Sequence, residues 1–289
     1  MIEYCIANYL IEEGRITNEQ FGELLNKQDA ARVKLGLIAV SEGLITKAQA
    51  DEINRLQMTR DARFGDIAVD LGYLREDQIT MLLRMQGSSY HAFLQVLTDE
   101  GIIKLEEADE IMKKVRLKEG LSTADIDAIK EGVVERILPI YMQDIPQPMI
   151  DLAGVLLRTI VRITDRHAFI EKAEIYSSYE LKYAEVQEFG GETGKFVTAY
   201  EDVHGGLVLL ASAFAKEAFK CIDEDSLDAV GEFENIVNGL YCSKLSKSDI
   251  NFDLEPQHTV ESGTVTGVVC VLPVRIRNKK FNFIVCDKI

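Results

Sequence analysis

The sequence has no tryptophan and only four histidines, and its five cysteines lie far apart along the chain. No two cysteines form a C-x-x-C pair, and free cysteines among apolar residues usually pack as small core side chains. No apolar run approaches the ~20 residues that a membrane-spanning helix needs. The opening segment MIEYCIANYL has no basic stretch ahead of an apolar block, so it is not a secretory signal. We therefore expect a cytoplasmic protein with no metal site and no membrane span.

Basic residues are scarce relative to acidic ones. Lys and Arg total 32 and Asp and Glu total 48, which gives a formal net charge of −16 at pH 7. Proteins that bind a nucleic-acid backbone normally carry a basic surface, so nucleic acid is not an expected partner. Hydrophobic residues make up 47% and charged residues 28% of the 289 residues, which is typical of a folded chain long enough for two domains.

Proline is absent from the first 138 residues, and three of the five prolines fall within Leu138–Pro148. Each proline fixes its φ angle and lacks an N–H group, so this segment predicts a break between domains. We expect an all-α domain at 1–138, a linker at 139–148 and a domain of mixed α and β structure at 149–289, an α+β fold class. The expected strands of the second domain include Lys195–Tyr200, Leu207–Leu210, Val265–Val274 and Phe281–Val285.

The first half of the sequence repeats with a period of 29 residues. The repeat is carried by Gly14, Gly43, Gly72 and Gly101, and by Gln28, Gln57 and Gln86. Around each glycine the pattern predicts a helix end, a left-handed residue and a new helix start. Thr17 with Gln20, and Thr46 with Gln49, fit capping boxes. We expect a module of short helices that bury their apolar stripes by stacking on one another.

Two of these units share a longer pattern, KLGLIAVSEGLITKAQADEINRLQ at 34–57 and RFGDIAVDLGYLREDQITMLLRMQ at 63–86. The pattern resembles the tandem motif of the MshE N-terminal domain of type II secretion and pilus ATPases. That motif binds cyclic di-GMP in several members, and the resemblance implies a nucleotide site at Lys34, Gly36, Gln57, Arg63, Gly65 and Gln86. Lys34 and Phe64 depart from the family's Arg and Leu, and losing the arginine removes a bidentate contact. A helical scaffold and a protein-docking module are the alternatives.

The sharpest functional pattern lies in DSLDAVGEFENIVNGLYCSKL at 225–245. Ser226 fits an N-cap, and the apolar spacing predicts a long amphipathic helix. The expected apolar face is Val230, Phe233, Ile236, Val237, Leu240 and Tyr241. The other side presents a row formed by Asp228, Glu232, Asn235 and Gly239. Asparagine and glycine each weaken a helix by up to ~1 kcal/mol relative to alanine, so another requirement selects them here.

This row resembles the signature of the CheX, CheC and FliY family of chemotaxis phosphatases, D/S-x3-E-x2-N with a proline about twenty residues later. The matching residues are Asp228, Glu232, Asn235 and Pro256, together with Gly239, which CheX proteins also carry; Leu240 replaces their second Asn. The resemblance covers about residues 147–289. It implies a mixed β-sheet flanked by two long helices, and pairing as homodimers.

The resemblance also implies a function, which is removal of the phosphoryl group from the aspartyl phosphate of a CheY-like receiver domain. Asn235 would orient the attacking water, Glu232 would pair with a receiver lysine, and Asp228 would favour the first part of the helix. Mg²⁺ would come from the receiver, and this chain would need no cofactor of its own. The alternative is a non-catalytic adaptor that docks on a receiver or a secretion-type partner, with or without control by cyclic di-GMP.

Two further segments are interpreted as structural. Residues 148–163 carry Asp151 but have Val155 and Arg158 where Glu and Asn would stand, so one site per chain is expected. The paired glycines of GGETGKFVTAY and HGGLVLLASAFA lack the G-x-x-x-x-G-K-[ST] pattern of a phosphate-binding loop. We expect both to be turns that lead into strands.

Overall fold

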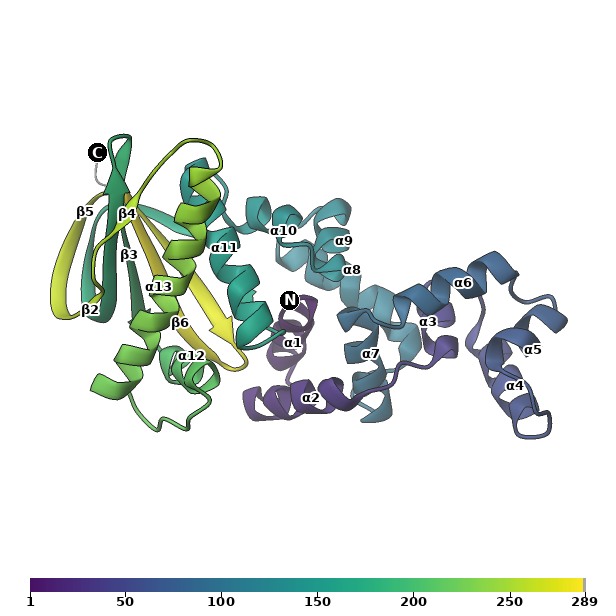
Figure 1. Ribbon diagram of the computed structural model, residues 1–289. Coiled ribbons are helices and arrows are strands. Elements are labelled where there is room, and N and C mark those ends of the chain that lie inside the picture. The colour runs from purple at the N-terminus through teal and green to yellow at the C-terminus, as the bar shows by residue number, and fades with distance from the viewer. Residues whose placement is uncertain (288–289) are drawn as a thin grey trace. The chain divides into compact units, whose positions relative to one another are not determined.

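The chain forms two compact units in the computed structural model, which describes residues 1–287 (Figure 1). The first unit is Ile2–Glu131, and the second begins at Gly132. The expected boundary at residue 138 and the linker at 139–148 fall inside the second unit, because the proline-containing segment is folded there. No helix within residues 1–287 is long and apolar enough to cross a membrane.

The first unit is built from helices alone. These are α1 (Ile2–Glu12), α2 (Asn18–Ala30), α3 (Leu35–Ser41), α4 (Lys47–Gln57), α5 (Phe64–Asp70), α6 (Glu76–Met85), α7 (Ser89–Asp99), the 3₁₀ turn η1 (Leu105–Glu107), α8 (Ala108–Lys118) and α9 (Thr123–Glu131). The four repeated glycines, at 14, 43, 72 and 101, adopt φ angles between +67° and +70°. At each one, the following residue donates its backbone N–H to a carbonyl five residues back, at 2.9 Å. This arrangement needs left-handed backbone, so the glycine period is confirmed as a helix-ending signal.

Capping boxes open two of the helices that follow, as predicted. The Thr17 backbone N–H donates to Gln20 Oε1 at 2.8 Å, and the Gln20 backbone N–H donates to Thr17 Oγ1 at 3.2 Å. Thr46 and Gln49 make the same pair of bonds at 2.8 and 3.3 Å. Each box satisfies two N–H groups that the first turn of a helix leaves without partners.

The second unit starts with two helices, α10 (Val134–Tyr141) and α11 (Gln147–Ile163). Pro139 lies inside α10 instead of ending a domain. Pro146 and Pro148 lie at the start of α11, where the missing N–H groups would have had no helical acceptor. The three prolines therefore lie in or directly before two helices of one unit.

One six-stranded sheet forms the rest of this unit, in the order β1-β5-β6-β3-β2-β4. The strands are β1 (Phe169–Ile170), β2 (Glu174–Gly191), β3 (Gly194–Asp202), β4 (Asp253–Leu254), β5 (His258–Ile276) and β6 (Lys279–Asp287). Every pairing among the described residues is antiparallel, so the expected mixed sheet is wrong. β2–β3 and β5–β6 are tight hairpins, and such short turns can join only antiparallel strands.

The expected strand at Leu207–Leu210 is also wrong, because this segment lies in helix α12 (Gly206–Ala215). The Asp202 carboxylate accepts the backbone N–H groups of Gly205 and Leu207, both at 2.8 Å, and so caps the helix start. A continuous apolar run has no period that separates strand from helix, which explains the error. The remaining helix is α13 (Glu224–Ser246). In Figure 1, α11, α12 and α13 lie on one face of the sheet.

The opposite face of the sheet is closed by its own two longest strands. β2 pairs with β3 through residues 184–191 and with β5 through residues 174–186, so the sheet folds over on itself. The buried apolar cluster there is Leu181, Ala184, Val186, Val197, Ala199, Val265, Val269, Val271, Ile284 and Cys286.

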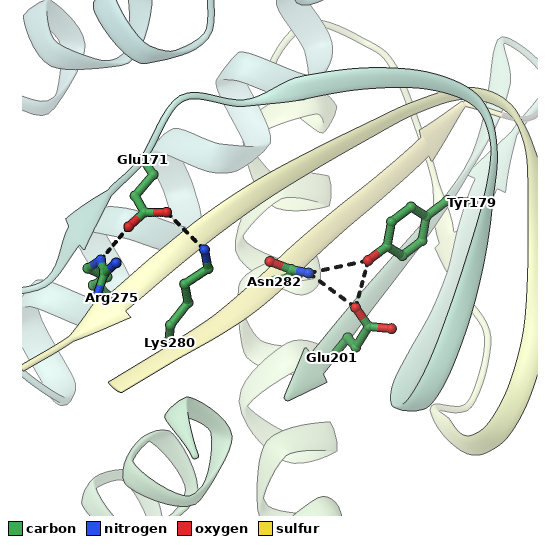
Figure 2. Close-up of polar contacts among 6 residues, drawn as sticks. All are labelled: Glu171, Tyr179, Glu201, Arg275, Lys280 and Asn282. Carbon is green, nitrogen blue, oxygen red and sulfur yellow. Dashed lines mark hydrogen bonds and ion pairs between the residues drawn. The ribbon is translucent and has the colours of Figure 1, made fainter. Parts of the chain in front are cut away.

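Two polar clusters tie these strands together (Figure 2). Glu201 on β3 accepts hydrogen bonds from the Tyr179 hydroxyl at 2.7 Å and from Asn282 Nδ2 at 3.1 Å. Glu171, just before β2, pairs with Arg275 and with Lys280, the latter at 2.9 Å. Burial raises the pKa of the Glu171 carboxyl, but the two cations more than offset this and lower its pKa overall.

Candidate functional site

Helix α13 carries the predicted row of polar residues and begins slightly earlier than expected. Its N-cap is Asp223, whose carboxylate accepts the Ser226 backbone N–H at 3.0 Å. The Ser226 hydroxyl in turn accepts the Asp223 backbone N–H at 2.8 Å. Ser226 is therefore the third helical residue of a capping box, not the N-cap itself.

The predicted row starts on the exposed side of the helix and runs towards the edge where α13 meets the sheet. Asp228 and Glu232 are exposed, and Asn235 and Gly239 are half-buried. A rise of about 1.5 Å per residue places Asp228 and Asn235 about 10 Å apart along the helix axis. The structure thus puts an acid, an acid and an amide along one accessible side of a long, well-capped helix.

The expected apolar face is partly wrong. Val230, Phe233 and Val237 are fully buried, as predicted. Ile236 and Leu240, however, are 39% and 46% exposed, and they lie beside the polar row. The helix is rotated from the expected orientation because two polar residues, not these apolar ones, face the sheet.

Those two inward-facing residues are Glu234 and Asn238, both fully buried. Asn238 Nδ2 donates to Gln187 Oε1 at 2.8 Å and to Thr198 Oγ1 at 2.7 Å. The Thr198 hydroxyl also lies 2.7 Å from Glu234 Oε1. Burial raises the pKa of Glu234 well above its usual value, which favours the protonated carboxyl in this layer. Sequence analysis missed this layer, although two polar residues within an otherwise apolar helix face were a visible signal.

Asn235 is held by the same layer. Gln187 Nε2 on β2 donates to Asn235 Oδ1 at 2.9 Å and to the backbone carbonyl of Glu255 at 2.9 Å. The Gln187 side chain is almost completely buried. The outward-facing amide of the row is therefore connected directly to the interior of the unit.

A second buried carboxyl, Glu185 on β2, lies under the row nearer its start. Burial raises the pKa of Glu185, and the nearby charge of Asp228 adds to the rise, although a hydrogen bond from Thr259 opposes it. Glu185 packs against Gly231 so closely that a Cβ at that glycine would lie 2.8 Å from Glu185 Oε1. Any larger residue at position 231 would therefore displace the Glu185 side chain.

Pro256 and Gly239 occupy different surroundings. Pro256 lies in the three-residue segment between β4 and β5, directly after the carbonyl that Gln187 contacts. At Gly239, a Cβ would find only Leu254 Cδ1, at 3.8 Å, so packing does not require a glycine there. A larger side chain could be accommodated at this position.

Helix α11 does not form a second row. Val155 is buried, Arg158 pairs with Glu135 at 2.6 Å, and the Asp151 carboxylate pairs with Lys244 at 3.3 Å. An acid and an amide are therefore not presented together on its surface.

The first unit shows what the repeated glutamines do. Gln57 Nε2 donates to the carbonyl of Ala62 at 3.3 Å, at the entrance to the second motif. Gln86 Nε2 donates to the carbonyl of Val33 at 2.9 Å, at the entrance to the first. These carbonyls are themselves 29 residues apart, so the two motifs exchange equivalent bonds. Gln28 Nε2 also donates to a backbone carbonyl, that of Ser89 at 2.9 Å, but this acceptor lies outside the 29-residue series.

The other predicted nucleotide-binding positions also contact the protein itself. A Cβ at Gly36 would lie 3.0 Å from the Phe64 ring, and one at Gly65 would lie 3.1 Å from Ile79. Lys34 Nζ pairs with Asp99 at 3.2 Å. Arg63, at the N-cap of α5, is exposed. The hollow next to Gly65, of about 370 Å³, is lined by three carboxylates, those of Asp66, Asp70 and Glu76. Such a lining disfavours an anionic ligand.

The C-terminal region is similar to solved structures of CheX and CheC-like chemotaxis proteins. A CheX protein from Vibrio vulnificus matches with 15% identity and a TM-score of 0.43, over 50% of this chain and 100% of that chain. A CheC-like superfamily protein from Shewanella sp. PV-4 matches with 17% identity and a TM-score of 0.43, over 49% and 97%. A chain of the CheX–CheY–BeF3–Mg²⁺ complex from Borrelia burgdorferi matches with 12% identity and a TM-score of 0.37, over 50% and 99%.

No protein-family profile and no curated protein sequence matches the chain. The function proposed below therefore depends on the residues of α13 and on the partners that hold them.

Proposed function

We propose that this protein hydrolyses the aspartyl phosphate of a CheY-like receiver domain, with Asn235 and Glu232 as the residues that act on it. One observation carries the proposal. The row on α13 contains an amide, that of Asn235, which accepts a hydrogen bond from a buried glutamine. An ordinary solvated helix face needs no such partner, because water satisfies its amides.

The chemistry suits a helix that offers an amide and no general base. Hydrolysis joins a water oxygen to phosphorus and breaks the bond from phosphorus to the aspartate oxygen, which keeps the electron pair. The protons of the water end on phosphate and in solvent. The Mg²⁺ and the lysine of the receiver neutralise the charge, so the metal belongs to the partner. Asn235 supplies the missing element, which is a group that holds water in line with the breaking bond.

The neighbours of Asn235 provide docking. Glu232 is exposed one turn earlier and pairs with the receiver lysine, which fixes the approach of the helix. Ile236 and Leu240 give an apolar contact on the other flank, where their exposure is otherwise unexplained. Gly239 lets the receiver approach closely, and Asp228 favours the start of the helix.

The experiment uses a panel of receiver domains from the same genome, each phosphorylated with a small phosphodonor. Phosphate loss is followed with the wild type and with Asn235→Ala, both checked for folding. We expect the wild type to accelerate dephosphorylation of one or two receivers, and Asn235→Ala to retain binding but lose the acceleration. A stable complex without any acceleration would contradict the phosphatase and favour the adaptor.

For the first unit we propose a scaffold or protein-docking role, because its repeated glutamines and glycines serve its own packing. Cyclic di-GMP binding is the alternative. Titration calorimetry with this dinucleotide should give no binding heat. Heat that disappears in Arg63→Ala would instead establish a nucleotide site.

Homodimer formation, which the resemblance implies, is a separate proposal for the second unit. Sedimentation velocity of the full chain at two concentrations tests it, and a single monomeric species at both would reject it.

A further inference from the structure

We propose that Gln187 is a positioning residue, which fixes the Asn235 amide so that Nδ2 faces the substrate as a hydrogen-bond donor. The inference rests on the proposed phosphatase function and deepens it. It assigns a role to a buried residue on β2, 48 residues away from Asn235 in sequence.

The orientation of both amides follows from one atom that can only accept. The backbone carbonyl of Glu255 lies 2.9 Å from the Gln187 amide, so the end facing it must be Nε2. The same Nε2 also faces Asn235, and a donor there requires the oxygen of Asn235 to point inward. Gln187 Oε1 in turn accepts a hydrogen bond from Asn238 Nδ2 at 2.8 Å. A Gln187 amide turned by 180° would lose this bond as well as the bond to the Glu255 carbonyl.

The position of that carbonyl is set by a bulge. Phe189 pairs with Leu254 and Val186 pairs with His258, so three residues, 255–257, stand opposite two on β2. The backbone N–H of Glu255 still bonds to the Glu188 carbonyl at 2.9 Å. Pro256 has no N–H to offer the ladder and restricts the residue before it to extended backbone. The proline of the motif thus helps to aim the Glu255 carbonyl at Gln187.

The result is an amide with its two ends in different environments. Oδ1 accepts inside the protein, and Nδ2 has no hydrogen-bond partner among residues 1–287. A donor in this place can hold the lone pair of the attacking water or a phosphoryl oxygen, and it cannot remove a proton. Without Gln187 the Asn235 side chain could rotate, and only some molecules would present the donor.

The test compares three variants of the full chain on a receiver that the wild type dephosphorylates. Gln187→Met keeps the volume and removes both donors. Gln187→Glu keeps the bond from Asn238 but places an oxygen opposite Asn235. Thr198→Val disturbs the same buried layer without touching Asn235, and serves as the matched control. We expect both Gln187 variants to lower kcat by about 10- to 100-fold with KM for the phosphorylated receiver unchanged, and Thr198→Val to keep kcat.

Wild-type kcat in both Gln187 variants would overturn the inference and leave the proposed function standing. An equal loss in Thr198→Val would also overturn it, because it would show general loosening of the layer. A second readout is independent of activity. The side-chain amide resonances of Asn235, assigned from their loss in Asn235→Asp, should shift in Gln187→Glu and stay in place in Thr198→Val.

If the wild type accelerates no receiver, the proposed function fails, and the spectra decide the orientation alone. Unshifted Asn235 resonances in Gln187→Glu would then overturn the positioning inference as well.

Discussion

The glutamines of the helical unit and the asparagine of α13 are polar residues that a sequence pattern singles out, yet the structure uses them differently. Gln57 and Gln86 donate to backbone carbonyls of the neighbouring motif, so their role is to join helices. Asn235 accepts one hydrogen bond through Oδ1, and its Nδ2 has no hydrogen-bond partner among the residues that the structure describes. The difference teaches that a repeated polar residue can be entirely structural. An amide with one end bound to a buried partner and the other end without a partner instead indicates a site.

The largest effect that can sharpen this comparison is expected from Asn235→Asp. The carboxylate has the shape of the amide but offers no donor, and its oxygen would repel the phosphoryl group. We expect dephosphorylation to fall about 100-fold, equivalent to about 3 kcal/mol in the barrier, with the urea midpoint of unfolding nearly unchanged. Activity close to that of the wild type would mean that Asn235 acts through its shape alone.

A smaller effect, on stability alone, is expected at the repeated glycines. Gly14 has a φ of +69°, so Gly14→Ala should lower the free energy of unfolding by about 1–2 kcal/mol. Gly22 lies within α2 with nothing within 4 Å of an added Cβ, so Gly22→Ala should raise it by up to about 1 kcal/mol. Urea unfolding of both variants measures the contrast, and equal signs would reject it.

The counterpart of the Asn235 exchange in the helical unit is Gln86→Glu. It replaces the donor to the Val33 carbonyl with an acceptor, and we expect a loss of about 1 kcal/mol in the stability of that unit. Dephosphorylation by the folded protein should not change. A loss of activity at constant stability would show that Gln86 has a functional role. The contrast between structural glutamines and a functional asparagine would then fail.

The last contrast concerns pH and the buried side of α13. The pKa of Glu234 is raised above its usual 4.5, so its contribution to stability is fully present below that pH. As pH rises, the unfolded chain releases the proton while the folded chain keeps it, and stability falls. Glu234→Gln cannot titrate, so its stability should fall less steeply between pH 5 and 8. Glu185 gives a slope of the same sign in both proteins, so the difference between slopes is the quantity to measure. Parallel curves would contradict the assignment.

Much of the site could be predicted because it lies on one helix. Positions 228, 232 and 235 share a side of any α-helix, whatever it packs against, so their spacing alone placed them together. The helix-ending glycines were predictable for a similar reason, since left-handed backbone is a local requirement.

The partners of Asn235 could not be predicted, because they depend on strand register. Gln187 meets both Asn235 and the Glu255 carbonyl only if β2 and the β4–β5 bulge pair as the structure shows. No local pattern specifies that register. The exposure of Ile236 and Leu240 was missed for a related reason. Hydrophobic spacing assumes that apolar residues face the core, but here the buried layer gives partners to Glu234 and Asn238 instead.

Gly231 lies where α13 packs closely against the side chains beneath it. A Cβ there would lie 2.8 Å from both Gln257 Cγ and Glu185 Oε1, so an added methyl group would displace these two side chains or shift the helix. Because α13 is one continuous helix, a shift at Gly231 would also move the residues that follow it. Asn235, one turn further along the helix, would then move away from Gln187. The position of the Asn235 amide is thus sensitive to the packing beneath a glycine four residues earlier in the helix.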